Sequence, residues 1–201
     1  VIYDFAGDYR NYNITKKEEI LNGDTIKYVN YQDIESYIEY DFKEEKDFDY
    51  SKLNKEELIS HIVKFTSSIW QIHPFGEGNT RTTAVFTIKY LRSLGFNVNN
   101  EPFEKHSWYF RNALVRANYT NMHKGIYMNT EYLEKFFRNI LLGENNELKN
   151  RYTHIDYDEY IKKFGDNQKS SVQNLPVNDK NLPVNLPVNK VQAELISFLK
   201  E

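Results

Sequence analysis

Residues 73–82 read His-Pro-Phe-Gly-Glu-Gly-Asn-Thr-Arg-Thr, a stretch that combines a base, a carboxylate, glycines, an amide and a guanidinium. Apolar residues recur at helical spacing on both sides, so the stretch predicts a loop between two helices. His73 can act as a general base near neutral pH. Glu77 offers the oxygen ligands that Mg²⁺ prefers. The stretch therefore indicates a chemical site.

The other residues of this stretch favour a bound anion. Gly76 and Gly78 let the backbone approach a ligand or take a positive φ angle. Asn79 and Thr80 open the next helix, whose free N–H groups and positive dipole end attract phosphate. Arg81 can hold a phosphate with its planar guanidinium. Together these groups indicate chemistry on a nucleoside triphosphate; the alternative is an ordinary helix–loop–helix turn with a buried histidine and a solvent-facing glutamate.

The order of these residues resembles the signature of the Fic family, His-Pro-Phe-x-(Asp/Glu)-Gly-Asn-Gly-Arg-x-x-Arg. Thr80 stands where the family has its second glycine, and Ala84 stands where it has its final arginine. Residues 5–14, which include Ala6-Gly7 and Arg10, resemble the segment that precedes the flap in Fic proteins. The matching motif positions are His73, Pro74, Phe75, Glu77, Gly78, Asn79 and Arg81.

Fic proteins typically move AMP from ATP to a Tyr, Thr or Ser hydroxyl of a target protein, so the resemblance implies a protein adenylyltransferase. It implies that His73 takes the hydroxyl proton, that Asn79 adds a side-chain contact, and that Glu77 holds Mg²⁺. Arg81 is then expected to hold a distal phosphate, and Phe75 to anchor the loop. The expected nucleotide-binding set is Gly76, Gly78, Asn79, Thr80 and Arg81.

The two departures leave other functions open. Ala84 removes the arginine that grips the γ-phosphate in the family pattern, a contact of about 1.5–3 kcal/mol. Doc-type relatives, which transfer the γ-phosphate, carry a lysine at the Thr80 position, so a Doc-like protein kinase is the second hypothesis. A non-catalytic nucleotide-sensing regulator, linked to a DNA-binding or dimerisation domain, is the third.

The fold expected is mainly α, a Fic-type helical bundle with a small β-hairpin flap. Asn22-Gly23 is a favourable two-residue hairpin turn, followed by β-branched and aromatic residues up to Asn30. The resemblance implies that the target protein docks on this flap near residues 22–30. On the expected helices, His61 is interpreted as structural, and His106 and Arg116 as surface residues rather than pocket-lining ones. Helical spacing or helix signals predict helices over 33–42, 54–72, 79–94, 103–117 and 130–142, with a charged loop over 43–50.

Four regions are expected along the chain. Residues 1–150 form the Fic-like catalytic domain, and 151–173 form a C-terminal extension. Residues 174–189 repeat a Leu-Pro-Val-Asn unit, and proline in each copy indicates an extended linker. Residues 190–201 return to helical spacing and are read as the start of a further element. Because the chain opens at Val1, we expect an N-terminally truncated fragment.

The amino-acid composition limits the kinds of binding partner that can be expected. A net charge of −3, from 26 basic and 29 acidic residues, gives no global nucleic-acid footprint, so DNA is expected only through a missing C-terminal domain. No run of about 18 apolar residues is present, so no membrane partner is expected. The chain has no cysteine, which fits a cytoplasmic protein. A homo-oligomer is left open, and the expected small-molecule partners are ATP and Mg²⁺.

Overall fold

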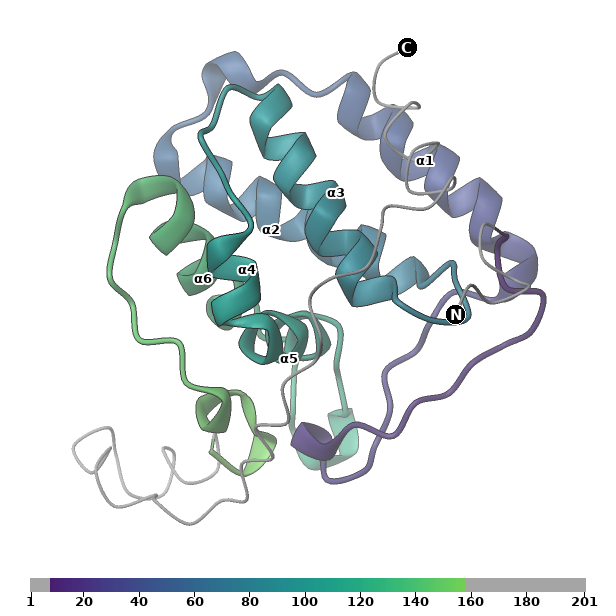
Figure 1. Cartoon of the computed structure of the whole chain (residues 1–201). Coiled ribbons are helices and arrows are strands. Elements are labelled where there is room, and N and C mark those ends of the chain that lie inside the picture. Colours follow the sequence, from purple (N-terminus) through teal and green to yellow (C-terminus); the bar gives the residue numbers. More distant parts are fainter. Residues whose placement is uncertain (1–7, 158–201) are drawn as a thin grey trace.

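A computed structural model describes residues 8–157, which form a bundle of six α-helices joined by loops and short 3₁₀ turns (Figure 1). The mainly α class is therefore confirmed. The helices are α1 (Ile34–Lys46), α2 (Lys55–Ile72), α3 (Asn79–Ser93), α4 (Glu101–Lys105), α5 (Ser107–Ala117) and α6 (Glu131–Leu142). The 3₁₀ turns are Glu19–Leu21, Tyr31–Asp33, Tyr50–Lys52, Met122–Lys124 and Asn150–Thr153.

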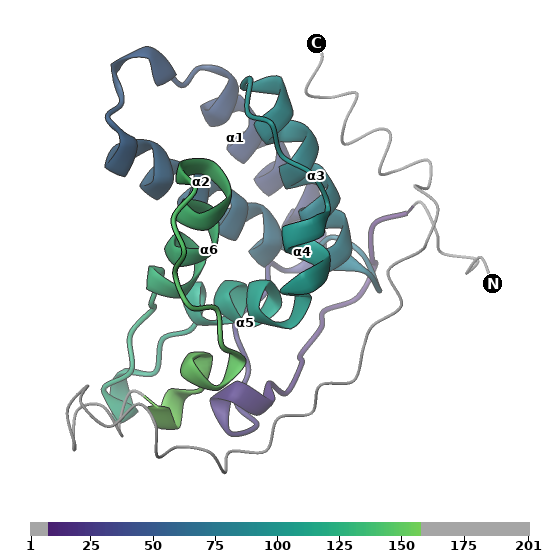
Figure 2. The same ribbon diagram turned by 60° about the vertical axis from the view of Figure 1, so that its left-hand side comes forward.

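Helix α2 is the centre of the bundle and contacts α1, α3, α5 and α6. It begins at Lys55 because Asn54 and Glu57 form a capping box, each side chain accepting from the other's backbone N–H. Its buried side chains face both sides of the bundle. Helices α1 and α6 lie on opposite sides of α2 in both views of the ribbon (Figure 1, Figure 2).

Two groups of buried apolar side chains flank α2. The smaller group fills the space between α1, α2 and α3, where Phe42, Phe65 and Phe86 meet edge to face with ring centroids 5.6–5.9 Å apart. The larger group joins α2 to α5 and α6 and includes Ile62, Phe110 and Phe137. The motif stretch, which connects α2 to α3, is therefore held at both ends by packed helices.

Helix α1 is longer than the pattern predicts, because it runs to Lys46 and takes up part of the expected loop 43–50. The cause is Glu45, whose buried carboxylate accepts hydrogen bonds from Tyr50 and Tyr90. His61 on α2 lies 2.8 Å from the same carboxylate, in keeping with the structural role expected of it. These partners come from distant segments, so local spacing could not reveal them.

The expected helix over 103–117 is divided in two. α4 begins at Glu101, with Pro102 in its first turn, where a missing N–H costs nothing. The chain then leaves helical geometry at His106, with φ −118° and ψ 30°, before α5 starts. The surface placement expected for Arg116 is wrong: its side chain is 1% exposed, and it donates to the Thr153 carbonyl over 2.9 Å.

The expected hairpin over residues 22–30 has its turn but no paired strands among the residues described. Asn22 and Gly23 take left-handed φ angles of 55° and 82°, and the turn closes the 3₁₀ segment before it. Residues 24–30 follow without regular secondary structure, and two of their carbonyls, at Lys27 and Val29, accept hydrogen bonds from distant side chains. Gln71 donates to the Lys27 carbonyl over 3.0 Å, and Arg10 donates to the Val29 carbonyl. These two side-chain hydrogen bonds hold a segment for which the turn predicts backbone hydrogen bonds between paired strands.

Several expectations lie outside the described residues. These are the Ala6-Gly7 part of the upstream segment, most of the extension from 151 to 173, the repeat at 174–189 and the helical element at 190–201. Within the described range, we find no helix long and apolar enough to cross a lipid bilayer.

Candidate active site

The motif loop, residues 73–78, starts and ends on residues with left-handed backbone. His73 ends α2 with φ 50° and ψ 55°, and its N–H donates to the Trp70 carbonyl over 3.1 Å. Gly78 begins α3 with φ 81°, a conformation that costs glycine little and a side-chain-bearing residue more. The strained backbone at His73 is of the kind that gathers at functional sites. The loop thus turns the chain sharply between two packed helices.

The imidazole of His73 is held in one tautomer. Its Nδ1 lies 3.1 Å from the Trp70 carbonyl oxygen, which can only accept a hydrogen bond. Nδ1 therefore carries the proton, and Nε2 keeps its lone pair. Nε2 has no hydrogen-bond partner within residues 8–157. The ring is thus prepared to accept a proton at Nε2.

The electrostatic surroundings of His73 keep the ring neutral. Its side chain is 3% exposed, and burial lowers its pKa from 6.5 to about 3, with a further lowering by the charges of Lys16, Arg10 and Arg111. The hydrogen bond to the Trp70 carbonyl acts in the opposite direction. A bound anion would add an opposite charge and raise the pKa again.

Asn79 closes the motif loop rather than facing it. The side-chain Oδ1 accepts from the Phe75 N–H over 2.9 Å, and Nδ2 donates to the Phe75 carbonyl over 2.7 Å. The residue is buried, and both ends of its amide are used by these bonds. Asn79 therefore positions the loop backbone, and a direct contact between its side chain and a ligand would break one of these bonds.

The other end of the loop presents unused donors. The N–H groups of Gly76, Glu77 and Gly78 form no hydrogen bond inside the described part of the chain, and no side chain caps α3. Arg81 is exposed, and its guanidinium lies beside Gly78, where an added Cβ would be 3.6 Å from Nη2. Free N–H groups, a helix N-terminus and a nearby guanidinium suit a phosphate group.

Comparison with known proteins bears on this loop. The model of the Fic/DOC family matches residues 1–91, a span that holds both the upstream segment and the motif. Residues 1–91 therefore belong to the Fic/DOC family. No curated protein and no solved structure matched the chain. Helices α4, α5 and α6 lie beyond the matched residues, although they complete the core around α2.

Both departures from the Fic signature are explained by packing in this Fic/DOC domain. Thr80 occupies the place of the second signature glycine, and its hydroxyl accepts a hydrogen bond from the Trp70 indole N–H over 3.0 Å. Ala84 occupies the place of the last signature arginine and packs against the larger core. Thr80 thereby fixes the ring that stands next to His73, whereas Ala84 leaves that position without a charge.

Arg10 is a residue of the Fic/DOC domain to which the sequence alone assigned no role. Its side chain is buried and donates to the carbonyls of His73 (2.8 Å), Tyr12 (2.7 Å) and Ile72 (3.3 Å), and also to Val29. Its own N–H donates to the Pro74 carbonyl over 2.8 Å. One guanidinium therefore links the upstream segment to the start of the motif loop. In the sequence, the only indication of this role was that Arg10 lies in the upstream segment.

The residues present fit a magnesium ion that is held mainly by phosphates. Glu77 is exposed on the loop, and its carboxylate has no ion-pair or hydrogen-bond partner in the described residues. Those residues contain no group of three or more His, Cys, Asp or Glu that could hold a metal by themselves. Mg²⁺ commonly takes one or two carboxylates and completes its shell with water and substrate phosphate. Glu77 suits that arrangement.

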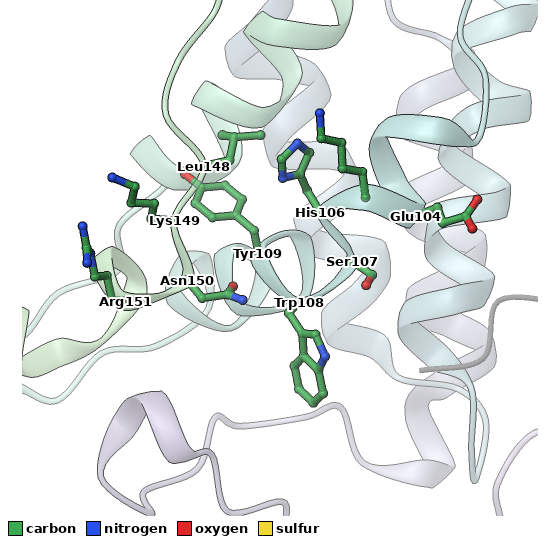
Figure 3. Close-up of a pocket in the computed structure, with 10 residues that line it drawn as sticks. Glu104, His106, Ser107, Trp108, Tyr109, Leu148, Lys149, Asn150 and Arg151 are labelled. Carbon is green, nitrogen blue, oxygen red and sulfur yellow. The ribbon is translucent and has the colours of Figure 1, made fainter. Parts of the chain in front are cut away.

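A separate hollow of about 490 Å³ lies between α4, the start of α5 and residues 148–151 (Figure 3). Among its lining residues, His106 and Tyr109 lie near Leu148, while Trp108 points away from them. His106 lines this hollow, so it is a pocket-lining residue rather than a fully exposed surface residue. Burial and the Lys105 charge lower its pKa. The hollow shares no residue with the motif loop.

Proposed function

We propose that this Fic/DOC domain transfers AMP from ATP to a hydroxyl side chain of a target protein. The observation that carries the proposal is the tautomer of His73, whose free Nε2 belongs to the same short loop as the unused N–H groups of residues 76–78. A base next to an anion-binding loop is the arrangement that phosphoryl chemistry requires.

In the proposed reaction, Nε2 of His73 takes the proton of the target hydroxyl. The hydroxyl oxygen bonds to the α-phosphorus, the bond from that phosphorus to the bridging oxygen breaks, and pyrophosphate leaves. The N–H groups of residues 76–78 stabilise the charge on the transferred group, and Arg81 holds a phosphate beyond it. Mg²⁺, which Glu77 would hold, supplies neutralisation of the phosphate charge when bound.

In this proposal, bound ATP also raises the pKa of His73. A base with a pKa of about 3 is neutral at pH 7 but accepts a proton weakly. The phosphates of ATP place negative charge near the ring and favour the imidazolium. His73 is thus a stronger base in the ATP complex than in the free protein.

The target segment is proposed to dock along residues 22–30. Residues 22–30 of this chain contact the proposed base His73 directly, because the Tyr28 ring packs on the His73 ring with centroids 4.3 Å apart. Its flap role is carried over from the family. A peptide laid there would bring a hydroxyl beside the motif loop.

The proposal is tested with ATP labelled in either the α or the γ position, incubated with the protein and candidate targets. We expect α-label on protein and no γ-label. His73→Asn should reduce the transfer by about 10²–10⁴-fold, because Asn tolerates left-handed backbone and replaces the bond to the Trp70 carbonyl without supplying a base. His123→Asn, at an exposed histidine, is the matched control and should transfer normally.

A second function is favoured by one observation, the uncharged Ala84 at the place of the signature arginine. Without that charge, ATP can seat with its γ-phosphate over the loop, and the domain then acts as a Doc-like protein kinase. Label appearing on protein only from γ-labelled ATP would establish this alternative. Absence of either label, with ATP bound, would favour a nucleotide-sensing regulator.

A further inference from the structure

The ring of His73 is enclosed by two aromatic side chains. The Tyr28 ring lies 4.3 Å from it, centroid to centroid, tilted by 46°. The Trp70 ring meets it edge-on at 5.2 Å, with an interplanar angle of 85°. Tyr28 and Trp70 also contact each other at 6.1 Å. Trp70 belongs to the helix that His73 ends, whereas Tyr28 comes from a distant segment.

Tyr28 also contacts a charged pair, in which Glu18 is buried and Arg111 is partly exposed. Its hydroxyl lies 3.5 Å from Oε1 of Glu18, a long contact, and Glu18 is 1% exposed. The other carboxylate oxygen of Glu18 pairs with Nη2 of Arg111 on α5 over 2.7 Å. Burial raises the pKa of Tyr28, so its hydroxyl keeps its proton as a donor. The hydroxyl end of Tyr28 therefore lies beside Glu18, and its ring packs, tilted, against the His73 ring.

We infer that Tyr28 is a positioning residue for His73. Its ring keeps the imidazole in the orientation in which Nδ1 bonds the Trp70 carbonyl and Nε2 keeps its lone pair. The pair Glu18–Arg111 holds Tyr28 in turn, so α5 sets the position of the base through two side chains. This inference rests on the proposed role of His73 as the base.

A purely stabilising role does not explain the pair. Burying the Glu18 carboxylate carries a desolvation cost that can exceed its attraction to Arg111, and apolar side chains of similar volume frequently stabilise a buried site as well or better. The better-attested use of such a pair is to select one arrangement of neighbouring groups. Here the arrangement it selects is that of Tyr28, whose ring also contacts the His73 ring at a tilt of 46°.

The orientation of His73 can be measured without any transfer activity, by ¹⁵N NMR of the ring nitrogens. The signal of His73 is identified among those of the 5 histidines by its loss in His73→Asn. In the wild-type protein we expect a single Nδ1–H tautomer for His73 that does not titrate between about pH 5 and 8. Tyr28→Phe keeps the ring and should preserve this signal. Tyr28→Leu should give mixed tautomers and a titration inside that range.

A control separates positioning from loss of core packing. Tyr109→Leu removes an equally buried tyrosine of the same core, on α5, and should lower stability without moving the His73 signal. In transfer assays, Tyr28→Leu should lower kcat by about 10- to 100-fold, the effect of a small misplacement, with the KM for ATP unchanged.

Should Tyr28→Leu fail to fold, Glu18→Gln serves in its place, because it keeps the shape of the side chain and leaves Arg111, 27% exposed, in reach of water. The inference is overturned if both variants leave the His73 signal as in the wild type, or if wild-type His73 titrates normally. Absence of transfer with these NMR results intact would refute the proposed function alone.

Discussion

The chemistry of His73 is set by what encloses it. From the sequence, His73 could be a general base or the buried histidine of an ordinary turn. In the structure the ring lies between Tyr28 and Trp70, and burial favours its neutral form. The same enclosure that fixes the tautomer therefore weakens the base, and substrate charge is needed to restore it.

This enclosure predicts a pH dependence of stability. The pKa of His73 is about 3 in the folded protein and ordinarily 6.5, so between these values the unfolded chain binds the proton more readily. The stability that His73 contributes is present above pH 6.5 and is lost as the pH falls toward 3. Its contribution changes by about 1.4 kcal/mol for each pH unit in that window.

The measurement is urea unfolding at a series of pH values below 6.5, compared between the wild type and His73→Asn. The free energy of unfolding should fall more steeply with acid in the wild-type protein than in the variant. His123→Asn should keep the wild-type slope. Equal slopes for the wild type and His73→Asn would mean that His73 binds its proton equally well in the folded and the unfolded chain.

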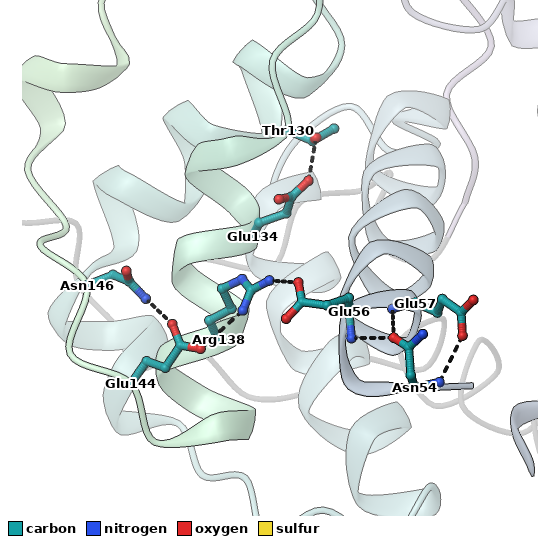
Figure 4. Close-up of polar contacts among 8 residues, drawn as sticks. All are labelled: Asn54, Glu56, Glu57, Thr130, Glu134, Arg138, Glu144 and Asn146. Carbon is teal, nitrogen blue, oxygen red and sulfur yellow. Dashed lines mark hydrogen bonds and ion pairs between the residues drawn. The ribbon is translucent and has the colours of Figure 1, made fainter. Parts of the chain in front are cut away.

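At the scale of elements, α2 connects the site to the rest of the bundle, and its first turn carries two kinds of polar contact (Figure 4). Asn54 and Glu57 form the capping box. Glu56, 68% exposed, accepts from Arg138 on α6, which also donates to Glu144 over 3.1 Å. The first contact satisfies backbone donors, whereas the second joins charges at the surface.

These contacts should differ in their effect on stability. Asn54→Ala should lower the free energy of unfolding by about 1 kcal/mol, because it leaves N–H groups of α2 unsatisfied. Glu56→Gln should lower it by about 0.5 kcal/mol or less, because an exposed ion pair is screened by water and salt. Chemical denaturation of both variants checks the order. A larger effect of Glu56→Gln would show that the link to α6 dominates.

At the scale of the whole molecule, the residues matched by the family model do not form a complete core. The buried side chains of α2 pack against α5 and α6, both beyond residue 91. Long-range polar contacts join the same parts, such as the bond from the Tyr119 hydroxyl to Asp24 over 2.7 Å. The apolar core therefore extends beyond the matched residues, through α6.

A fragment of residues 1–91 should accordingly fail to fold cooperatively. We expect a broad thermal transition by circular dichroism and binding of a hydrophobic dye, because apolar faces of α2 and α3 are left exposed. A fragment of residues 1–157 should show a single sharp transition. Cooperative unfolding of the shorter fragment would contradict the core described here.

The sequence by itself determined the helices that flank the motif and the residue types of the site. The predicted range 54–72 and the observed α2 agree because the signals are local: an asparagine cap, a glutamate three residues later and apolar residues at helical spacing. Gly78 is also a local signal, since glycine takes the left-handed φ of 81° before α3 at little cost.

The tertiary structure alone decided how these residues act. The length of α1 depends on Glu45 reaching Tyr90, and residues 24–30, which form no paired strand, are held by Arg10 and Gln71 at the carbonyls of Val29 and Lys27. The tautomer of His73 follows from the backbone bend at the end of α2, and its enclosure from a tyrosine far along the chain. Such contacts join segments whose separation in sequence carries no periodic signal, so only the folded chain brings them together.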